Sequence, residues 1–217
     1  MTNKDYIKNK NYKKIKDFLN DDIVKINRPN ILEFGVQKGY STFYFLNCCK
    51  NNGKLTSVDI KDCSKLFKNK NWTFIKSRDD DYKLISEYIG NKLDIIYLDT
   101  MHTADHVEKI INLYFSKLKI NGYFVIDDTF WLPYCKNQYR DNFWIEINNR
   151  ETFKRILEIY NNNQKTMELK FSYNLSGMCK IKKINDNKLN NKKKIINREK
   201  SIRNIIRKSI IFLRKTY

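Results

Sequence analysis

The stretch that decides the fold is residues 31–42, which read ILEFGVQKGYST. The first four residues predict the end of a strand, and a helix-compatible segment follows. Gly35 and Gly39 bracket a tight turn between them, and the whole chain has only six glycines. Glycine lets the backbone approach a ligand because no Cβ stands in the way. A strand–turn–helix connection that needs glycine only for its geometry is the alternative.

The spacing of this motif is Glu-x-Gly-x-x-x-Gly-x-Ser, from Glu33 to Ser41. It differs from the Gly-x-Gly-x-x-Gly pattern of dinucleotide-binding proteins and from the Gly-x-x-x-x-Gly-Lys-Ser pattern of a phosphate loop. The motif therefore indicates a turn that approaches a ligand without matching either of these nucleotide-binding patterns.

Strand and helix patterns alternate around this motif for about 160 residues. We expect strands at 30–34, 55–60, 72–76, 93–98 and 123–126, helices at 4–19, 42–49, 82–89, 107–118 and 147–160, and a closing hairpin at 167–173 and 178–184. This order predicts an α/β fold, a Rossmann-like doubly wound mostly parallel seven-stranded sheet with an antiparallel C-terminal hairpin. Ligands of such sheets bind at the carboxyl ends of the strands.

The composition says more about where the protein is located than about what it binds. The 217 residues carry a net charge of +19, but Lys and Asn are abundant even in apparent loops, which is typical of an AT-rich genome of viral or low-GC origin. The five cysteines include no Cys-x-x-Cys pair, which argues against a disulfide framework or a zinc site. With no signal sequence and no apolar run of about 20 residues, we expect a cytoplasmic protein.

Asp59 ends the second expected strand, twenty residues after Gly39. A carboxylate there can accept hydrogen bonds from both ribose hydroxyls of a nucleotide cofactor. An aspartate that caps the segment after the strand is the alternative.

Three more aspartates follow two strands that are neighbours in this topology. Asp99 ends the fourth strand, and Asp127 and Asp128 end the fifth. Like charges this close repel unless they are protonated or bridged by a cation, and an all-oxygen set suits Mg²⁺, Ca²⁺ or Mn²⁺. A metal that holds a substrate hydroxyl lowers the pKa of that hydroxyl, which is useful for O-methylation.

These residues resemble the class I S-adenosylmethionine (SAM) dependent methyltransferases. The stretch from Leu98 to Asp128 is similar to the metal-dependent O-methyltransferases related to macrocin O-methyltransferase and cephalosporin hydroxylase. The resemblance covers about residues 30–130 and implies a site for SAM and a site for a divalent metal, with Mg²⁺ expected. The implied cofactor-binding residues are Glu33, Gly35, Gly39, Ser41, Asp59, Ser77 and Asp99, and the implied metal ligands are Asp99, Asp127 and Asp128.

The chain also departs from this family. Thr100 and Asn121 each replace a usual glycine, and neither change removes a ligand. The third strand ends in Lys76-Ser77-Arg78, so the acid that the family often places near the adenine is missing or displaced to Asp79.

His102 lies three residues beyond Asp99 and is the candidate catalytic base. An imidazole with an ordinary pKa near 6.5 can take a proton from a hydroxyl at neutral pH. A histidine that orients Asp99 or caps the next helix is the alternative. His106, one helical turn further, is expected to support the site or lie at the surface. The aromatic residues between Phe130 and Trp144 are expected either to line an acceptor pocket or to form a small cluster under a loop.

We therefore expect a methyltransferase domain at 1–184, with an N-terminal helix at 1–20, and a basic amphipathic extension at 185–217. The extension carries eleven Lys or Arg residues against two acids. It is a solvated tail that packs on the domain, or it docks on a membrane surface or a protein; no specific nucleic acid is expected. Self-association into a homo-oligomer stays open.

The predicted function is SAM-dependent, divalent-metal-assisted O-methylation of a small molecule or glycan, with a sugar hydroxyl favoured by analogy. Three alternatives remain at this point. The chain is a hydroxylase-like enzyme, a metal-independent enzyme on the same fold, or a non-catalytic binding module whose basic tail engages a membrane or nucleic acid.

Overall fold

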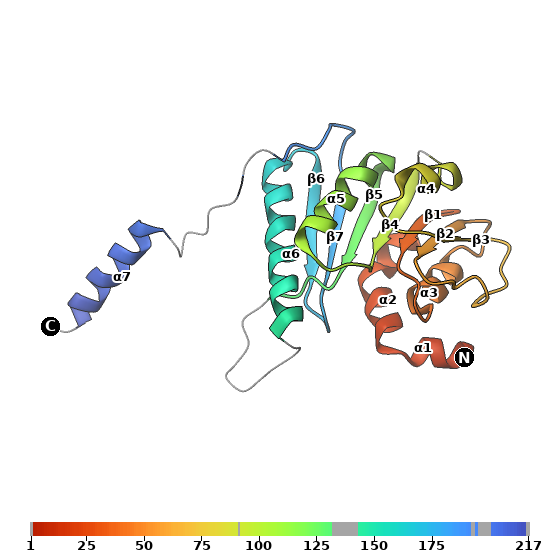
Figure 1. Cartoon of the computed structure of the whole chain (residues 1–217), viewed down its shortest axis with the longest axis horizontal. Coiled ribbons are helices and arrows are strands. Elements are labelled where there is room, and N and C mark those ends of the chain that lie inside the picture. The colour runs from red at the N-terminus through yellow and green to blue at the C-terminus, as the bar shows by residue number, and fades with distance from the viewer. Residues whose placement is uncertain (1, 91, 132–142, 192–193, 195–200, 216–217) are drawn as a thin grey trace.

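The computed structural model describes residues 2–90, 92–131, 143–191, 194 and 201–215 (Figure 1). The helices are α1 (Asn3–Lys8), α2 (Lys10–Ile23), α3 (Tyr40–Cys48), α4 (Tyr82–Tyr88), α5 (Ala104–Tyr114), the 3-10 helix η1 (Phe115–Lys117), α6 (Phe143–Asn162) and α7 (Ile202–Lys215). The strands are β1 (Asn30–Phe34), β2 (Lys54–Asp59), β3 (Trp72–Lys76), β4 (Leu93–Leu98), β5 (Leu118–Asp127), β6 (Met167–Ser172) and β7 (Met178–Lys183).

These strands form one seven-stranded sheet in the order β3-β2-β1-β4-β5-β7-β6. Strands β1 to β5 are parallel, and β7 inserts antiparallel between β5 and β6. The predicted fold class is confirmed. Because the strand order reverses direction between β1 and β4, the topological switch point lies where the turn after β1 meets the end of β4.

Helices cover both faces of the sheet. Residues at alternate positions of a strand point to opposite faces, so a strand covered on both sides is buried throughout, as β4 is. Ile95 and Tyr97 belong to the core under α2 and α3, whereas Ile96 and Leu98 belong to the core under α4, α5 and α6.

The single helix predicted at 4–19 is instead two helices that meet at Asn9. Asn9 is extended, with φ −67° and ψ 138°, and its side chain accepts a hydrogen bond from the backbone N–H of Asn11 at 2.8 Å. An asparagine in this role caps the second helix and ends the first. The break turns α1 onto α3, where the ring of Tyr6 stacks on Phe43 at 4.7 Å.

Strand β5 starts at Leu118, five residues before the predicted start at Tyr123. The pairing with β4 shifts register between Leu93 and Ile95, so the expected turn at Asn121 and Gly122 is an irregularity within one long strand. A bulge of this kind bends a strand without ending it.

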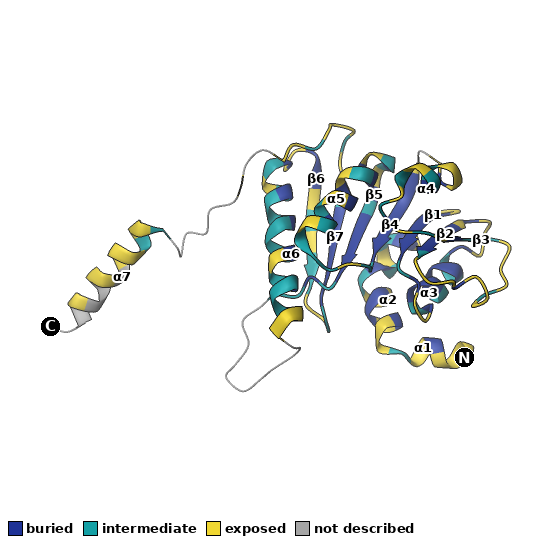
Figure 2. Ribbon diagram, in the orientation of Figure 1, coloured by how far each residue is buried: buried dark blue, intermediate teal, exposed yellow. Residues whose placement is uncertain are grey.

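The chain beyond β7 continues along the sheet before it leaves the domain. Asn190 donates its backbone N–H to the side chain of Asn163 at 2.8 Å, and Leu189 packs on the core. In contrast, α7 stands apart from the sheet and its described side chains are mostly exposed (Figure 2). Within the described ranges, no helix is long and apolar enough to cross a membrane.

Candidate active site

Gly35 forms the floor of the site, where β1 ends. Its φ is +91°, and a Cβ on Gly35 would lie 1.9 Å from the backbone oxygen of Asp99. The backbones approach this closely because β1 and β4 are parallel neighbours, and Asp99 donates its N–H to the carbonyl of Phe34 at 2.9 Å. Only glycine fits at this position.

Gly39 is required for a different reason. It caps α3 in the left-handed region, with φ +77°, and a Cβ would lie 2.7 Å from the ring of Phe67. Gly39 does not line the cavity described next. Its role in the structure is therefore the geometry of the turn.

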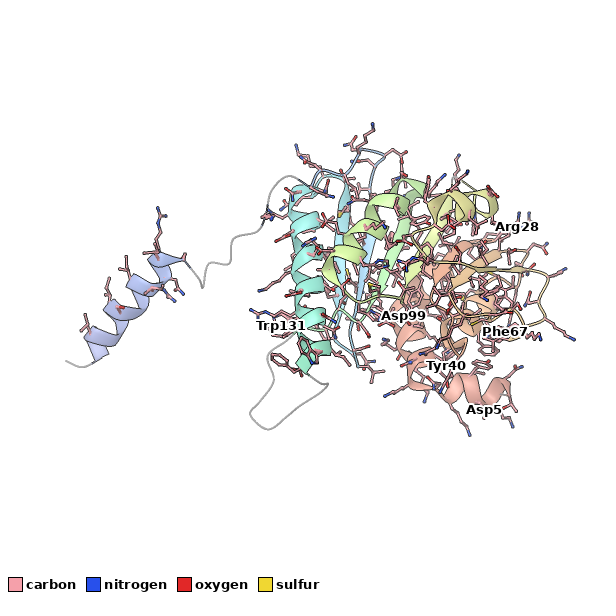
Figure 3. All side chains as sticks on the ribbon, viewed as in Figure 1. Asp5, Arg28, Tyr40, Phe67, Asp99 and Trp131 are labelled. Atoms are coloured by element: carbon pink, nitrogen blue, oxygen red, sulfur yellow. The ribbon has the colours of Figure 1, made fainter. Side chains whose placement is uncertain are left out.

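A cavity of about 510 Å³ opens at the carboxyl ends of the strands. In Figure 3, Asp99 lies at the edge where β4 ends, near the start of α3, which carries Tyr40. The cavity is lined by seven of the residues expected from the sequence: Gly35, Ser41, Asp59, Ser77, Asp99, His102 and Asp127. Its size is that of a small-molecule site.

Glu33 does not line this cavity, although it was expected to bind the cofactor. Its side chain is fully buried, and Oε2 accepts hydrogen bonds from the hydroxyls of Ser57 at 2.6 Å and Thr42 at 2.8 Å. Burial raises the pKa of Glu33 to about 7, although the hydroxyls of Ser41, Ser57 and Thr42 oppose the shift. Glu33 thus joins β1 to β2 and α3 behind the cavity wall.

Asp59 holds the glycine turn in place. Its Oδ2 accepts the backbone N–H groups of Val36 at 2.8 Å and Gln37 at 3.0 Å, and its Oδ1 accepts that of Lys61 at 2.8 Å. Burial alone would raise the pKa of Asp59, but these three backbone hydrogen bonds outweigh it and the net pKa is lowered. The carboxylate therefore stays ionised beside the cavity and combines the loop-capping role with a place on the cavity wall.

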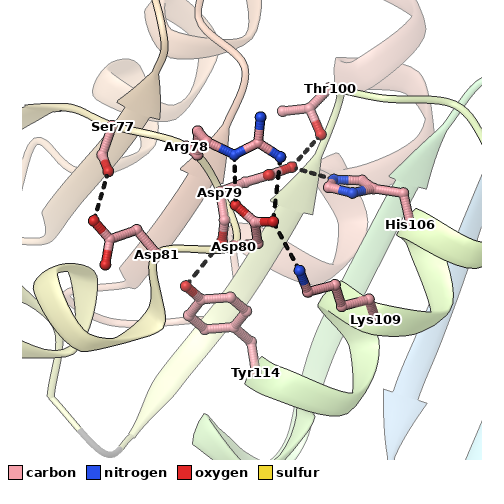
Figure 4. Close-up of polar contacts among 9 residues, drawn as sticks. All are labelled: Ser77, Arg78, Asp79, Asp80, Asp81, Thr100, His106, Lys109 and Tyr114. Carbon is pink, nitrogen blue, oxygen red and sulfur yellow. Dashed lines mark hydrogen bonds and ion pairs between the residues drawn. The ribbon is translucent and has the colours of Figure 1, made fainter.

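Asp79 also lies in the cavity wall. The sequence named it only as the position to which the acid expected near the adenine is displaced. Its Oδ2 contacts the Thr100 hydroxyl and lies 2.7 Å from Nε2 of His106, while its carbonyl accepts the Tyr114 hydroxyl at 2.9 Å (Figure 4). His106 thus supports the site through Asp79. The aspartate was hard to assign because neighbouring Asp80 and Asp81 give the same residue type at adjacent positions.

Asp127 is almost fully engaged. Its Oδ1 accepts from the Lys14 ammonium on α2 and from the backbone N–H of Asp128 at 2.7 Å, and its Oδ2 accepts the Tyr97 hydroxyl at 2.8 Å. The Lys14 and Asp127 side chains are only 3% and 7% exposed. Neither Lys14 nor Tyr97 was expected at the site.

The other two aspartates converge on the candidate base. Nε2 of His102 lies 3.4 Å from Oδ1 of Asp99 and 3.4 Å from Oδ2 of Asp128. Burial and the charges of Asp127 and Asp128 raise the pKa of Asp99 well above its usual range, and Lys14 opposes this shift. The imidazole of His102 therefore lies between the side chains of two acids that come from the ends of β4 and β5.

This arrangement does not fit the predicted metal site. Three of the about four lone-pair positions of the Asp127 carboxylate are already used, and an ammonium lies where a metal charge would. Among the described residues, no group of three or more His, Cys, Asp or Glu side chains is arranged to hold a metal ion. The sequence-based prediction that Asp99, Asp127 and Asp128 form one ligand set is therefore not met here, because Asp127 faces Lys14 while the other two face His102.

The aromatic residues after β5 do not line the cavity where they are described. Trp131 lies under the guanidinium of Arg150 at 5.1 Å, and Phe143 and Trp144 are exposed at the start of α6. Tyr134 and Tyr139 lie outside the described residues.

Comparison with known proteins finds a domain match and a shared fold. Residues 32–129 match the Methyltransf_24 family, described as a methyltransferase domain. The structure is similar to MycE methyltransferase from the mycinamycin biosynthetic pathway in complex with Mg and SAH, with a TM-score of 0.59 and 16% identity over 86% of this chain and 51% of that one. It is also similar to the SAH-bound Podospora anserina methyltransferase PaMTH1, with a TM-score of 0.61 and 13% identity over 85% of this chain and 83% of that one.

The chain thus spans about half the length of the MycE structures. A search of curated proteins gave no match. Residues 32–129 thus match a methyltransferase domain, and the chain shares the fold of these methyltransferase structures, which supports the resemblance predicted from the sequence.

The close approach at Gly35 gives a first prediction. Gly35→Ala should lower the free energy of unfolding by about 3 kcal/mol, because the new methyl group meets the Asp99 carbonyl and the backbone is left-handed. Gly90→Ala is the matched control, since a Cβ there has nothing within 4 Å. Urea unfolding of both variants tests this, and equal losses would contradict it.

Glu33 gives a pH-dependent prediction. Its folded-state pKa of about 7 lies above the ordinary glutamate value of 4.5, so the folded protein binds this proton more tightly than the unfolded chain. The stability from this proton is fully present below pH 4.5 and is lost as the pH rises through about 7. Relative to Glu33→Gln, the wild-type protein should therefore lose on the order of 3 kcal/mol of stability over that range.

Chemical unfolding of both proteins across this pH range measures the difference. Glu87→Gln, at an exposed position of α4, is the matched control and should show none. A wild-type protein that keeps a constant difference from Glu33→Gln at all pH values would contradict the buried, proton-binding role of Glu33.

Proposed function

We propose that the protein transfers the methyl group of SAM to a hydroxyl of a small molecule or glycan, with a sugar hydroxyl favoured. The observation that carries this proposal is the position of His102, which lines the cavity with two carboxylates within 3.4 Å of its Nε2. A base supported in this way is what O-methylation requires of the protein.

The cofactor would occupy the part of the cavity between the glycine turn and Asp59. Gly35 leaves room for the methionine end of SAM, with Ser41 and Asp99 on the adjoining walls. The Asp59 carboxylate accepts three backbone N–H groups, which leaves one of its about four lone-pair positions for a ribose hydroxyl. Ser77 would lie toward the adenine. Glu33 would act from behind the wall, by holding Ser57 and Thr42.

The reaction needs one proton transfer and one methyl transfer. The acceptor oxygen forms a bond to the methyl carbon as the bond from that carbon to sulfur breaks, which leaves S-adenosylhomocysteine. The hydroxyl proton passes to His102, whose Nε2 lies 3.4 Å from Oδ1 of Asp99 and 3.4 Å from Oδ2 of Asp128. The reaction as proposed runs without a metal.

The acceptor class rests on analogy. A MycE structure is described as a complex with Mg, SAH and mycinamycin VI, which supports a small-molecule acceptor for this chain and is the reason to keep metal assistance as the alternative. The assignment of residues 1–184 to the catalytic domain and of 185–217 to an extension is part of the same proposal. A nucleic-acid partner is not proposed, and self-association stays a prediction.

Two variants separate binding from chemistry. His102→Gln should lower the rate of methyl transfer by about 100-fold or more while SAM affinity stays unchanged. Asp59→Asn should weaken SAM binding by about tenfold or more, because an amide has only one acceptor oxygen and cannot accept the three backbone N–H groups and a ribose hydroxyl as well. Asp62→Asn, in the same loop but exposed, is the matched control.

Calorimetry with SAM and SAH measures the affinities. Mass spectrometry of small-molecule and glycan extracts incubated with the enzyme and labelled SAM, with and without EDTA, measures transfer. No heat from SAM would reject the enzyme proposal in favour of a binding module. Full transfer by His102→Gln would show that another group takes the proton.

For α7 we propose a second role, attachment to an anionic membrane surface. Its apolar residues recur at helical spacing, and the described members of this stripe are mostly exposed: Ile202 75%, Ile206 54%, Ile210 46% and Leu213 60%. The sequence of the helix adds five Lys or Arg residues and no acid. A helix with these two faces suits an interface of acyl chains and acidic headgroups, and its charge complements anionic lipid.

Vesicle sedimentation tests this role. The full chain should sediment with phosphatidylcholine vesicles that contain phosphatidylserine, and salt should reduce the binding. Ile206→Glu should abolish it, whereas Asn204→Glu, which adds the same charge to the opposite face of the helix, should reduce it far less. Equal binding by both variants would contradict a membrane role for the apolar stripe.

A further inference from the structure

A buried ammonium group lies at the edge of the sheet that carries the three aspartates. Lys14 reaches from α2 to Asp127, 113 positions further along the chain. Its Nζ also lies 2.9 Å from Oγ of Ser176, in the turn between β6 and β7. Lys14 therefore joins α2, the end of β5 and the C-terminal hairpin at one point.

The ion pair between Lys14 and Asp127 is buried. The exposed fraction of the Lys14 side chain is 3%, so its charge is largely withdrawn from water and needs a nearby anion. Asp127 is that anion, and its orientation is fixed by the Tyr97 hydroxyl at 2.8 Å and by the backbone N–H of Asp128 at 2.7 Å. The contact is therefore built into the core and is unlike a surface ion pair.

The ammonium of Lys14 also compensates negative charge at this edge of the sheet. Asp99, Asp127 and Asp128 gather at the ends of two neighbouring strands, and carboxylates this close need a compensating positive charge. A lysine ammonium is a compact point charge, and it repels any further cation brought beside it.

We infer that the Lys14 ammonium takes the place of a divalent cation at this edge, so that the site neutralises Asp127 with the protein's own charge. The inference rests on the proposed function, because it concerns the same acceptor site. It makes α2 part of that site, although Lys14 lies outside residues 32–129, the part that matches the methyltransferase family. Lys14 is a positioning residue: it holds Asp127 away from the cavity centre and leaves Asp99 and Asp128 to His102.

Metal binding tests this directly, without the need for an acceptor. The full chain, freed of metal with EDTA, is titrated with Mn²⁺, and the free ion is followed by electron paramagnetic resonance. The wild-type protein should show no saturable site at millimolar Mn²⁺. Lys14→Met removes the charge while it keeps a long side chain, and it should raise Mn²⁺ affinity by about tenfold or more, since Asp127 is then unpaired.

Two further variants serve as controls. Lys13→Met changes the exposed neighbour and Lys14→Arg keeps the charge, so both should bind Mn²⁺ no better than wild type. Saturable wild-type binding of one Mn²⁺ at micromolar concentration would overturn the inference, and so would a folded Lys14→Met variant that gains no affinity. If Lys14→Met does not fold, the wild-type titration still decides whether this edge of the sheet binds a divalent cation.

Titration with SAH, in the same samples, separates this inference from the proposed function. Wild type and Lys14→Met should bind SAH with similar affinity, because the cofactor walls do not include Lys14. Loss of SAH binding in every sample would reject the proposed function and leave the Mn²⁺ result to stand by itself. Methyl transfer that persists in EDTA supports both, and transfer that requires added Mg²⁺ would overturn the role of Lys14.

Discussion

The structure depends on the close approach of two backbones, where the turn after β1 passes the end of β4. A Cβ at Gly35 would lie 1.9 Å from the Asp99 oxygen, and this contact forms the floor of the cavity. The same turn is held from the other side by Asp59, which accepts the N–H groups of Val36 and Gln37. The cavity wall that carries Asp59 and the wall that carries Asp99 therefore meet at one junction, at the switch point of the sheet.

Around this junction the acids are satisfied in different ways, and the differences assign their roles. Glu33 is fully buried and holds its proton more tightly than usual. Asp59 is kept ionised by backbone N–H groups. Asp127 is paired with the buried Lys14, while Asp99 and Asp128 face His102. A site that gathers this much negative charge at one edge must compensate it locally, and each partner comes from a different element.

Much of the fold could be predicted from local patterns. The apolar run of β4, the glycines after β1 and the alternation of elements follow from periodicity and turn chemistry within short windows. The break at Asn9 was missed because a cap needs only one side-chain hydrogen bond, which the helical spacing of apolar residues does not reveal. The early start of β5 was missed because Asn121 and Gly122 have turn composition but lie in a bulged strand.

The sequence by itself determined the sheet, the resemblance to methyltransferases and the strand ends where the polar residues gather, because these depend on order along the chain. Only the tertiary structure decided how the charges pair. Nothing in the sequence distinguishes Lys14 from Lys13, yet one is buried against an aspartate 113 positions away and the other is exposed. Pairing over such a distance is set by how α2 packs on the sheet, and packing of that kind leaves no local signal in the residues themselves.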